Sequence, residues 1–438
     1  MPIEDDQETA RALHTLLREA AVPPSRADIG EAVRQGRRAE RRRRGAAATV
    51  AAVALLGVIG TATVVLGRGG EVRPEPARPV PSISPGPIGT VTAQVRTVPV
   101  TISDETLSCD IAPLVLPTEA RQVHVEGIDP SGRFIVGRIA IAAGRVAQRA
   151  EGQQVLWDRG TPKVFHVPNG SRRGSPVVNA DGVVAGTGND NQGEGREREF
   201  GWVYRDGQVH RLPLLSGYDA ARVGAITPQG DIVGHAYRIP PIGETVSVAV
   251  PVLWRSDGTG GPWPLSTPEN GGEVLGVTRD GTVVGAHGMS RIRIWRPDGS
   301  AADLQLPPGI TRTSGWHVSG DWVTGFVAPG DAQSPTPLMR WNVRTGKLDV
   351  YPRIDTEGVF SMAVNAGGWM IVSTPKDRQL VVAPDGTVRR LPTPPGAEDW
   401  PRHLDASVIS DNGLVVGGAY HGPSAPVVSR DYTWQCGG

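Results

Sequence analysis

The sequence repeats one short pattern seven times between residues 126 and 418. A typical copy, Val277 to Gly285, has a β-branched residue, a turn that ends in glycine, and an apolar run closed by a second glycine. The last three copies are looser than the first four. Strands and tight turns that repeat every 40 to 50 residues are typical of β-propeller blades. The sequence therefore predicts an all-β, seven-bladed propeller, with turn glycines at Gly132, Gly182, Gly230, Gly281, Gly320, Gly368 and Gly413.

Each repeat has room for four strands. In the third repeat, two apolar stretches at 222–227 and 231–237 flank the turn, and a third at 250–254 leads to Asp257-Gly258, a hairpin signal. Residues 261–265 would form a short outer strand. A tryptophan recurs in the third strand, and one aromatic residue per blade is typical of packing between blades, which we favour over a base or sugar platform. These residues are Trp157, Trp202, Trp254, Trp295 and Trp341.

Composition fits a fold rich in turns and argues against one class of partner. Glycine accounts for 57 of the 438 residues, nearly double the usual ~7%. Many short strands need glycine at turns with positive φ. The formal net charge is zero, so the whole chain lacks the basic surplus of a nucleic-acid-binding protein.

An apolar segment precedes the repeats. Residues 46–66 contain no charged side chain, and a helix of that length covers roughly 30 Å, the thickness of the bilayer hydrocarbon. We predict a transmembrane helix at 46–67. A cleaved signal peptide is the alternative, but its charged and apolar parts would both be unusually long. By the positive-inside rule, the arginines before the segment place residues 1–45 in the cytoplasm and the rest outside the cell membrane; they include Arg37, Arg38, Arg41, Arg42, Arg43 and Arg44.

The regions on either side of this segment lack the repeat. Residues 1–45 predict two short helices, one with an apolar stripe over 7–21, that end in the arginine run. This stub is either a juxtamembrane segment without a core of its own or a docking site for a cytoplasmic partner such as a sigma factor. Residues 68–98 begin with a stretch rich in Pro, Gly and Ser, which predicts an extended linker. The propeller domain is then 99–438.

The two cysteines stand at opposite ends of the propeller region. The last repeat ends one strand short, at Cys436, and the apolar run that follows Cys109 can supply the missing strand. Leu116-Pro117 would then occupy the place that Leu306-Pro307 has in another repeat. The sequence thus predicts a ring closed by three C-terminal strands plus one N-terminal strand, with a Cys109–Cys436 disulfide beside the junction. A disulfide requires an oxidising compartment, in agreement with the predicted topology.

The repeat resembles a known type. Its pattern, Ile or Val, then Asn or Thr, a turn glycine, Val-Val-Gly, and later Trp and Asp-Gly, resembles the HAF-type extracellular repeat and the TolB-like, WD40-like propeller repeat. The resemblance covers roughly 107–436. It implies a propeller, and it says little about chemistry because propellers have many unrelated functions. The layout of stub, span, linker and propeller is similar to that of anchored exported proteins of actinobacterial type.

No catalytic motif, metal-binding cysteine cluster or phosphate-binding loop is present in the sequence, so we predict neither a metal nor another cofactor. One pattern points to a ligand site. His235, His287 and His421 each come shortly after the apolar run of a second strand, with Tyr237 and Tyr420 at comparable places. Loops after second strands lie on one face of a propeller. The five side chains either line one ligand-binding funnel or are unrelated surface residues.

These observations lead to three hypotheses. The first is a membrane-anchored extracytoplasmic propeller that binds a protein, peptide or cell-wall glycan without catalysis. The second is a transmembrane sensor whose residues 1–45 dock a cytoplasmic regulator. The third is an extracellular hydrolase or lyase with its site in the propeller funnel, which would need carboxylates beside the histidines.

Overall fold

The computed structural model contains two compact units, 1–80 and 81–438. All residues that the structure describes belong to the second unit. In these residues no helix occurs, so no segment of them forms an apolar helix long enough to span a membrane. The predicted stub (1–45), the predicted transmembrane helix (46–67) and residues 68–88 of the predicted linker lie outside the described residues. These are 89–118, 120, 122–140, 152–168, 175–191, 197–239, 249–257, 262–265, 271–287, 291–306, 310–329, 337–355, 361–374, 378–396, 404–420 and 429–436.

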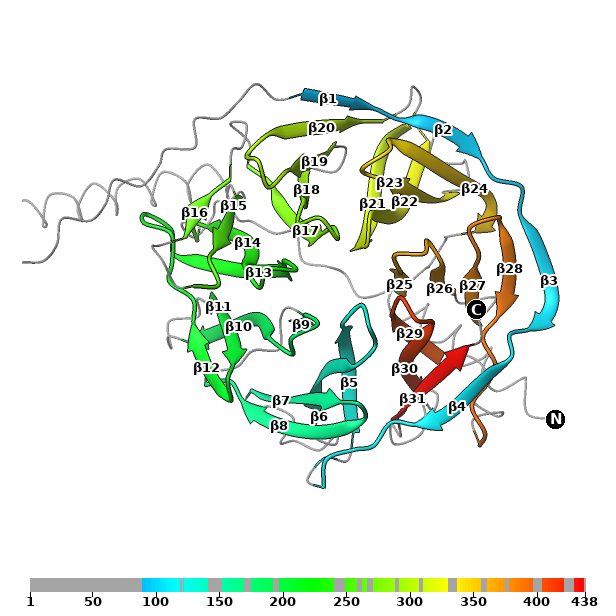
Figure 1. Cartoon of the computed structure of the whole chain (residues 1–438), viewed down its shortest axis with the longest axis horizontal. Coiled ribbons are helices and arrows are strands. Elements are labelled where there is room, and N and C mark those ends of the chain that lie inside the picture. The colour runs from blue at the N-terminus through cyan, green and yellow to red at the C-terminus, as the bar shows by residue number, and fades with distance from the viewer. Residues whose placement is uncertain are drawn as a thin grey trace, which may run out of the picture. The chain divides into compact units, whose positions relative to one another are not determined.

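Seven sheets form a ring, as the repeats predict, and each sheet is one blade (Figure 1). Blades 1 to 3 have four strands each, and the first strand of each blade lies nearest the centre. Blade 1 contains β5 (Gln122–Ile128), β6 (Phe134–Ala140), β7 (Gln153–Asp158) and β8 (Thr161–His166). Blade 2 contains β9 (Val177–Val178), β10 (Val184–Asn191), β11 (Glu197–Arg205) and β12 (Gln208–Arg211). Blade 3 contains β13 (Ala220–Ile226), β14 (Ile232–Tyr237), β15 (Ala249–Trp254) and β16 (Trp263–Pro264).

Blades 4 to 6 follow the same order and have a fifth strand each, and blade 7 takes its fourth strand from elsewhere in the chain. Blade 4 contains β17 (Glu273–Val277), β18 (Val283–His287), β19 (Arg291–Trp295) and β20 (Ala301–Gln305). Blade 5 contains β21 (Ile310–Ser319), β22 (Trp322–Pro329), β23 (Pro337–Asn342) and β24 (Lys347–Asp355). Blade 6 contains β25 (Ser361–Val364), β26 (Met370–Thr374), β27 (Arg378–Val382) and β28 (Thr387–Arg390). Blade 7 contains β29 (Leu404–Ile409), β30 (Leu414–Tyr420) and β31 (Ser429–Cys436).

The two glycines of the repeat have different physical roles. All seven turn glycines have positive φ, from 58° at Gly320 to 85° at Gly281, a conformation that side chains with a Cβ rarely adopt. The second glycine lets the inner strand approach closely. A Cβ at Gly234 would lie 1.9 Å from the carbonyl oxygen of Arg222 on the neighbouring strand. The repeat therefore encodes both the turn and the packing of the strand that follows it.

The recurrent tryptophans pack between blades, as predicted. Trp254 of blade 3 is 3% exposed and lies in one apolar cluster with Leu212, which follows β12 of blade 2. Its indole Nε1 donates a hydrogen bond to the carbonyl oxygen of Pro213, at 2.8 Å. The indole of Trp157 makes the equivalent bond to Val115, at 2.7 Å.

That bond corrects one prediction about the N-terminal strand. The acceptor of Trp254 follows Leu212, and the acceptor of Trp157 follows Leu114. Leu114-Val115 therefore takes the place that the sequence analysis assigned to Leu116-Pro117, two residues later. The repeat offers two Leu-containing pairs in a row, and only strand pairing distinguishes them.

The N-terminal strands run along the outer edge of the ring (Figure 1). We call residues 89–113 the belt. Its first three strands, β1 (Gly89–Thr92), β2 (Gln94–Thr97) and β3 (Thr101–Thr106), pair in parallel with β20, β24 and β28 of blades 4, 5 and 6. The predicted linker extended to residue 98, but the structure places 89–98 on the ring. Apolar spacing did not reveal these strands because Val95 and Ile102 face outward, 50% and 61% exposed.

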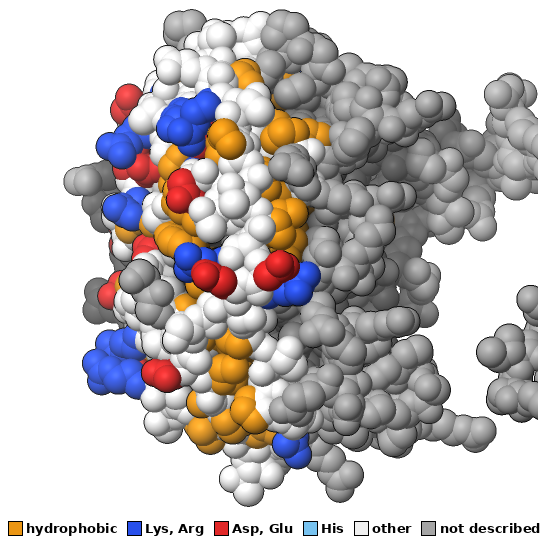
Figure 2. All heavy atoms as spheres, turned by 90° about the vertical axis from the view of Figure 1, so that its right-hand side faces the viewer, with side chains coloured by type: hydrophobic (Ala, Val, Ile, Leu, Met, Phe, Trp, Pro, Cys, Tyr) orange, Lys and Arg blue, Asp and Glu red, His pale blue; other side chains and the backbone are white. Residues whose placement is uncertain are grey.

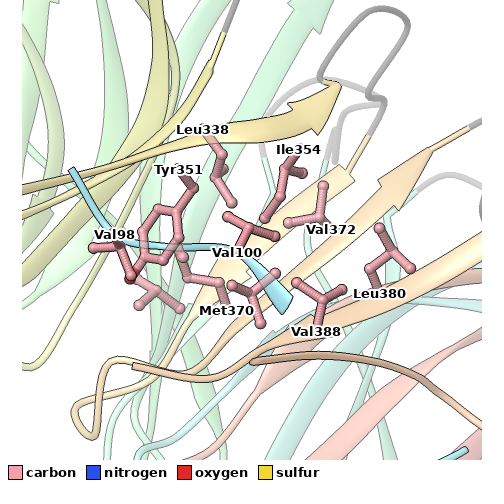
Figure 3. Close-up of a cluster of buried hydrophobic side chains, with 11 residues drawn as sticks. Val98, Val100, Leu338, Tyr351, Ile354, Met370, Val372, Leu380 and Val388 are labelled. Atoms are coloured by element: carbon pink, nitrogen blue, oxygen red, sulfur yellow. The ribbon is translucent and has the colours of Figure 1, made fainter. Parts of the chain in front are cut away.

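The belt is also part of the core. Val98 and Val100 are 2% and 6% exposed, and they lie in one cluster with Tyr351 of blade 5 and with Met370 of blade 6 (Figure 3). On the outer surface near β3, apolar side chains form a band between charged ones (Figure 2). The connection between β2 and β3 thus buries both of its valines, whereas the first three belt strands themselves are mostly exposed.

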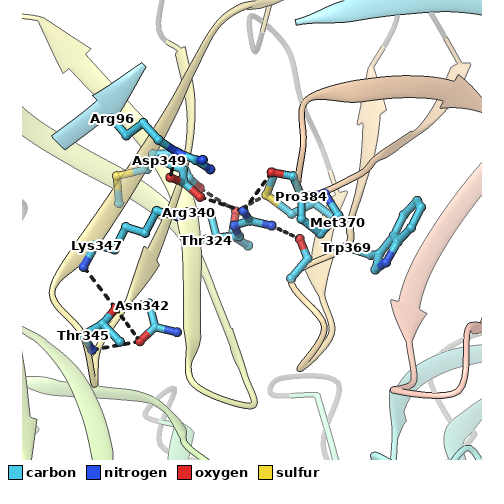
Figure 4. Close-up of polar contacts among 12 residues, drawn as sticks. Arg96, Thr324, Arg340, Asn342, Thr345, Lys347, Asp349, Trp369, Met370 and Pro384 are labelled. Carbon is cyan, nitrogen blue, oxygen red and sulfur yellow. Dashed lines mark hydrogen bonds and ion pairs between the residues drawn. The ribbon is translucent and has the colours of Figure 1, made fainter. Parts of the chain in front are cut away.

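A buried ion pair fastens the belt to two blades (Figure 4). Asp349 of β24 accepts a hydrogen bond from Arg96 of β2, at 2.8 Å, and one from Arg340 of β23, at 2.7 Å. Arg340 also donates to the carbonyl oxygen of Gly368 in blade 6. Burial alone would raise the pKa of Asp349, but the two guanidinium groups outweigh that effect and lower it. Asp349 is therefore an ionised link between the belt and blade 5.

Blade 7 joins the C-terminal strand of the propeller to the last strand of the belt. The last belt strand, β4 (Cys109–Pro113), pairs antiparallel with β31 and is the fourth strand of this sheet. Cys109 and Cys436 face each other in the register and form a disulfide. Blade 7 also bonds to blade 1: the amide of Asp411 donates to the carbonyl oxygen of Pro130, at 2.8 Å.

Removal of the disulfide should destabilise the ring. The chain-entropy estimate for a loop of this length is about 5–6 kcal/mol, and native disulfides typically contribute about 2–4 kcal/mol. We expect Cys109→Ser/Cys436→Ser to lose about 2–4 kcal/mol in urea unfolding. The reductant-treated wild type should match the double variant, and the double variant should not respond to reductant. An unchanged unfolding midpoint would contradict a stabilising role.

Candidate functional site

Two of the predicted site residues lie together on β14 of blade 3. The rings of His235 and Tyr237 have centroids 6.3 Å apart. Burial lowers the pKa of His235 to about 4, so the imidazole is neutral at neutral pH. His235 is only 6% exposed, and its Nδ1 has no hydrogen-bond partner.

Charged groups beside this pair neutralise one another. Arg222 of β13 donates to both carboxylate oxygens of Glu199, which projects from β11 of blade 2 and is 4% exposed. The hydroxyl of Tyr237 donates to the same carboxylate. Burial and this hydrogen bond raise the pKa of Tyr237. The cluster joins blades 2 and 3 through an ion pair in which the charges of Arg222 and Glu199 balance. Such a cluster can stabilise the contact between blades as well as bind a ligand.

The other predicted residues are only partly described. His287 and Tyr420 are the last residues of β18 and β30, so the second strands extend further than the repeat pattern indicated. The side chains of both residues, and all of His421, lie outside the described residues. Convergence of these five side chains in one funnel therefore stays a prediction.

A second site, which the sequence analysis missed, lies between blades 1 and 7. A cavity of about 240 Å³ opens between the inner strands of these blades. We call it the seam cavity. It is lined by His124, Val125 and Glu126 of β5, Arg138 of β6, Ser407 of β29, Gly418 of β30 and Asp431 of β31.

Strand irregularities bring these residues to the cavity. The pairing register of β5 with β6 skips Glu126, and that of β29 with β30 skips Ser407, so each of them is the extra residue of a β-bulge. Gly418 pairs with Asp431. Because Gly418 has no side chain, space remains beside the Asp431 carboxylate. The two bulges and one glycine thus create the opening where the first and last blades meet.

The buried carboxylate of Glu126 dominates the electrostatics of the cavity. Glu126 forms an ion pair with Arg138, and its side chain is only 9% exposed. Its second oxygen, Oε2, has no hydrogen-bond partner. Burial raises the pKa of Glu126 to about 7, although Arg138 acts in the opposite direction. Burial and the charge of Arg138 lower the pKa of His124.

A signal for this site exists in the sequence. Glu126 stands two residues before the first residue of its repeat pattern. The equivalent residues in the other copies are Pro176, Gly224, Leu275, Gly315, Met362 and Ser407. Glu126 is thus the one ionisable residue among the seven. A charged residue at a position that is uncharged in the other copies of a repeat is expected at a functional site.

The seam cavity combines hydrogen-bond acceptors, a guanidinium group and an imidazole. It suits recognition of a polar group by charge. Among the residues that the structure describes, no group of three or more His, Cys, Asp or Glu side chains is placed to hold a metal ion. Arg138 and His124 can donate hydrogen bonds to a ligand oxygen, and Glu126 and Asp431 can accept them from a ligand nitrogen.

Comparisons with known proteins do not name a family for this chain. No protein-family model and no curated protein matches it. Its fold is similar to that of an inactive virginiamycin B lyase variant from Staphylococcus aureus with quinupristin, at 12% identity and a TM-score of 0.46, over 75% of this chain and 99% of that one.

Two further solved propellers are similar. YCF48 bound to D1 peptide matches at 11% identity and a TM-score of 0.43, over 78% of this chain and 100% of that chain. A putative TolB from Agrobacterium tumefaciens matches at 14% identity and a TM-score of 0.36, over 52% of this chain and 80% of that chain. The three include a lyase and a peptide complex, so such a likeness assigns no function.

The raised pKa of Glu126 predicts a pH-dependent stability. Folding favours the protonated form, so its contribution is complete below the ordinary pKa of 4.5 and is lost as pH rises through about 7. The full effect is about 3 kcal/mol. We expect the free energy of unfolding of Glu126→Gln, relative to wild type, to rise between pH 5 and pH 8. Glu105→Gln, at a 76% exposed side chain, is the matched control. A difference that does not vary with pH would contradict the assignment.

Proposed function

We propose that this protein is a membrane-anchored, extracytoplasmic β-propeller that binds a protein, peptide or cell-wall glycan without catalysis. The seam cavity carries the proposal: it is a recessed site in a rigid ring, with charged groups and a buried carboxylate oxygen that lacks a partner. Sites with a few converging polar groups in a preformed cavity are typical of ligand binding.

The anchored, extracytoplasmic location is supported by the arginine run before the uncharged segment 46–66 and by the Cys109–Cys436 disulfide. We propose in addition that the repeats are of the HAF type and that the protein is of actinobacterial type. The sensor hypothesis depends on residues 1–45, and the hydrolase or lyase hypothesis depends on convergence of His235, His287 and His421. Both stay predictions that no described contact favours.

The binding role has a direct test. The immobilised full-length chain should bind at least one member of a random peptide library or of a panel of cell-wall glycan fragments. Arg138→Ala and Asp431→Asn should weaken that binding at least tenfold, because both side chains line the cavity. Mass spectrometry should recover the bound ligand unchanged after prolonged incubation. Failure to bind either class would refute the proposal, and chemical conversion of the ligand would show an enzyme.

The topology is tested by labelling single introduced cysteines with a membrane-impermeant maleimide in intact cells. We expect Thr106→Cys, on the exposed belt, to react from outside, and Ser25→Cys, in the predicted stub, to react only after lysis. A chain found in the medium with its N-terminus removed would instead indicate a cleaved signal peptide.

A further inference from the structure

We infer that the seam cavity binds a primary ammonium group of a peptide, either the N-terminal amine or a lysine side chain. This inference rests on the proposed binding function and names the chemistry that the site recognises. It follows from the charges that line the cavity, from its acceptor atoms and from its size.

The charges favour a cation. The cavity is lined by two carboxyl groups, Glu126 and Asp431, and by one guanidinium group, Arg138. Arg138 already forms an ion pair with Glu126. The lowered pKa of His124 leaves its imidazole neutral at neutral pH. Among the described lining residues, carboxyl groups outnumber guanidinium groups by two to one, which favours a cationic ligand.

The acceptors match the three donors of an ammonium group. Oε2 of Glu126 is buried and has no partner, which costs free energy that a ligand donor recovers. Asp431 supplies a second carboxylate from the opposite blade. Ser407 uses its hydroxyl proton for the carbonyl oxygen of Val125, at 3.3 Å, so its oxygen remains an acceptor. An ammonium group has three donors and no acceptor, so it can donate one hydrogen bond to each of these three acceptors.

The size favours one group of a longer ligand. A cavity of about 240 Å³ holds roughly eight waters, and pockets that take a whole drug-sized ligand measure roughly 300–1,000 Å³. Val125 adds an apolar wall, which suits the methylene part of a lysine side chain. An amino acid terminus or a lysine side chain fits, and the rest of the peptide would lie outside the cavity.

Binding should be coupled to proton release from Glu126. Among the described residues, the titratable and charged groups that line the cavity with Glu126 are Arg138, His124 and Asp431, and an incoming ammonium group adds a positive charge among them. That charge favours the ionised carboxylate. The affinity should therefore rise with pH up to about 7, where Glu126 ionises without ligand, and then level off.

The test uses the full-length chain and four probes in titration calorimetry: glycylglycine amide, its N-acetyl form, Nα-acetyl-lysine methylamide, and the same compound acetylated on Nζ. We expect binding of at least one free amine and at least tenfold weaker binding of its acetylated partner. Glu126→Gln and Asp431→Asn should each weaken amine binding at least tenfold, whereas Glu105→Gln should not change it. Buffers of different ionisation enthalpy should reveal proton release below pH 7 in the wild type and none in Glu126→Gln.

The outcomes distinguish the two possible sources of the ammonium group, and they distinguish failure of this inference from failure of the proposed function. Binding of only glycylglycine amide assigns an N-terminus, and binding of only the lysine compound assigns a side chain. Equal binding of free and acetylated forms overturns the inference. Glucosamine, added as a fifth probe, represents a glycan amine, and tighter binding of it than of both peptide amines overturns the peptide assignment. If no amine binds but the library ligand still does, the inference fails and the proposed function stands. If nothing binds, both fail.

Discussion

The ring depends on one constraint: each blade must bury both of its faces against neighbouring blades. Trp254 of blade 3 lies with residues of blade 2, and Val100 of the belt lies with residues of blades 5 and 6. A blade at the end of an open array would expose one apolar face, at a cost of about 25 cal/mol per Å². Blade 7 therefore has to meet blade 1. The pairing of β4 with β31 and the Cys109–Cys436 disulfide bring the two ends of the propeller together in that blade.

This meeting of first and last blades is also where the repeat departs from its own pattern. In the cluster of Glu199, Arg222 and Tyr237, both oxygens of the buried carboxylate accept hydrogen bonds. At the seam, a bulge places Glu126 in a buried position with one oxygen unsatisfied, and Gly418 leaves space beside Asp431. A buried carboxyl group that lowers stability at neutral pH is typical of a site kept for binding, since stability alone would favour an apolar residue.

The belt makes the ring asymmetric. It adds parallel outer strands to blades 4, 5 and 6, whereas β8, β12 and β16 are the outermost strands of blades 1 to 3. The belt strands β1, β2 and β3 pair with the outer edges of these blades and become their edge strands. The Asp349 link shows that the cover is specific: one buried carboxylate holds an arginine of the belt and an arginine of blade 5.

The amino-acid sequence by itself determined the number of blades, because turns with positive φ require glycine and those glycines recur at one period. It also determined the cysteine pair, since the last repeat lacks a strand that the region after Cys109 can supply. It did not reveal β1 and β2, which are mostly exposed and in which Val95 faces outward, or the offset of Leu114 from Leu116. Only the tertiary structure decided these points. The seam cavity also became visible only in the tertiary structure. β5 and β29 are almost 300 residues apart along the chain, and only closure of the ring places Glu126 beside Ser407 and Asp431.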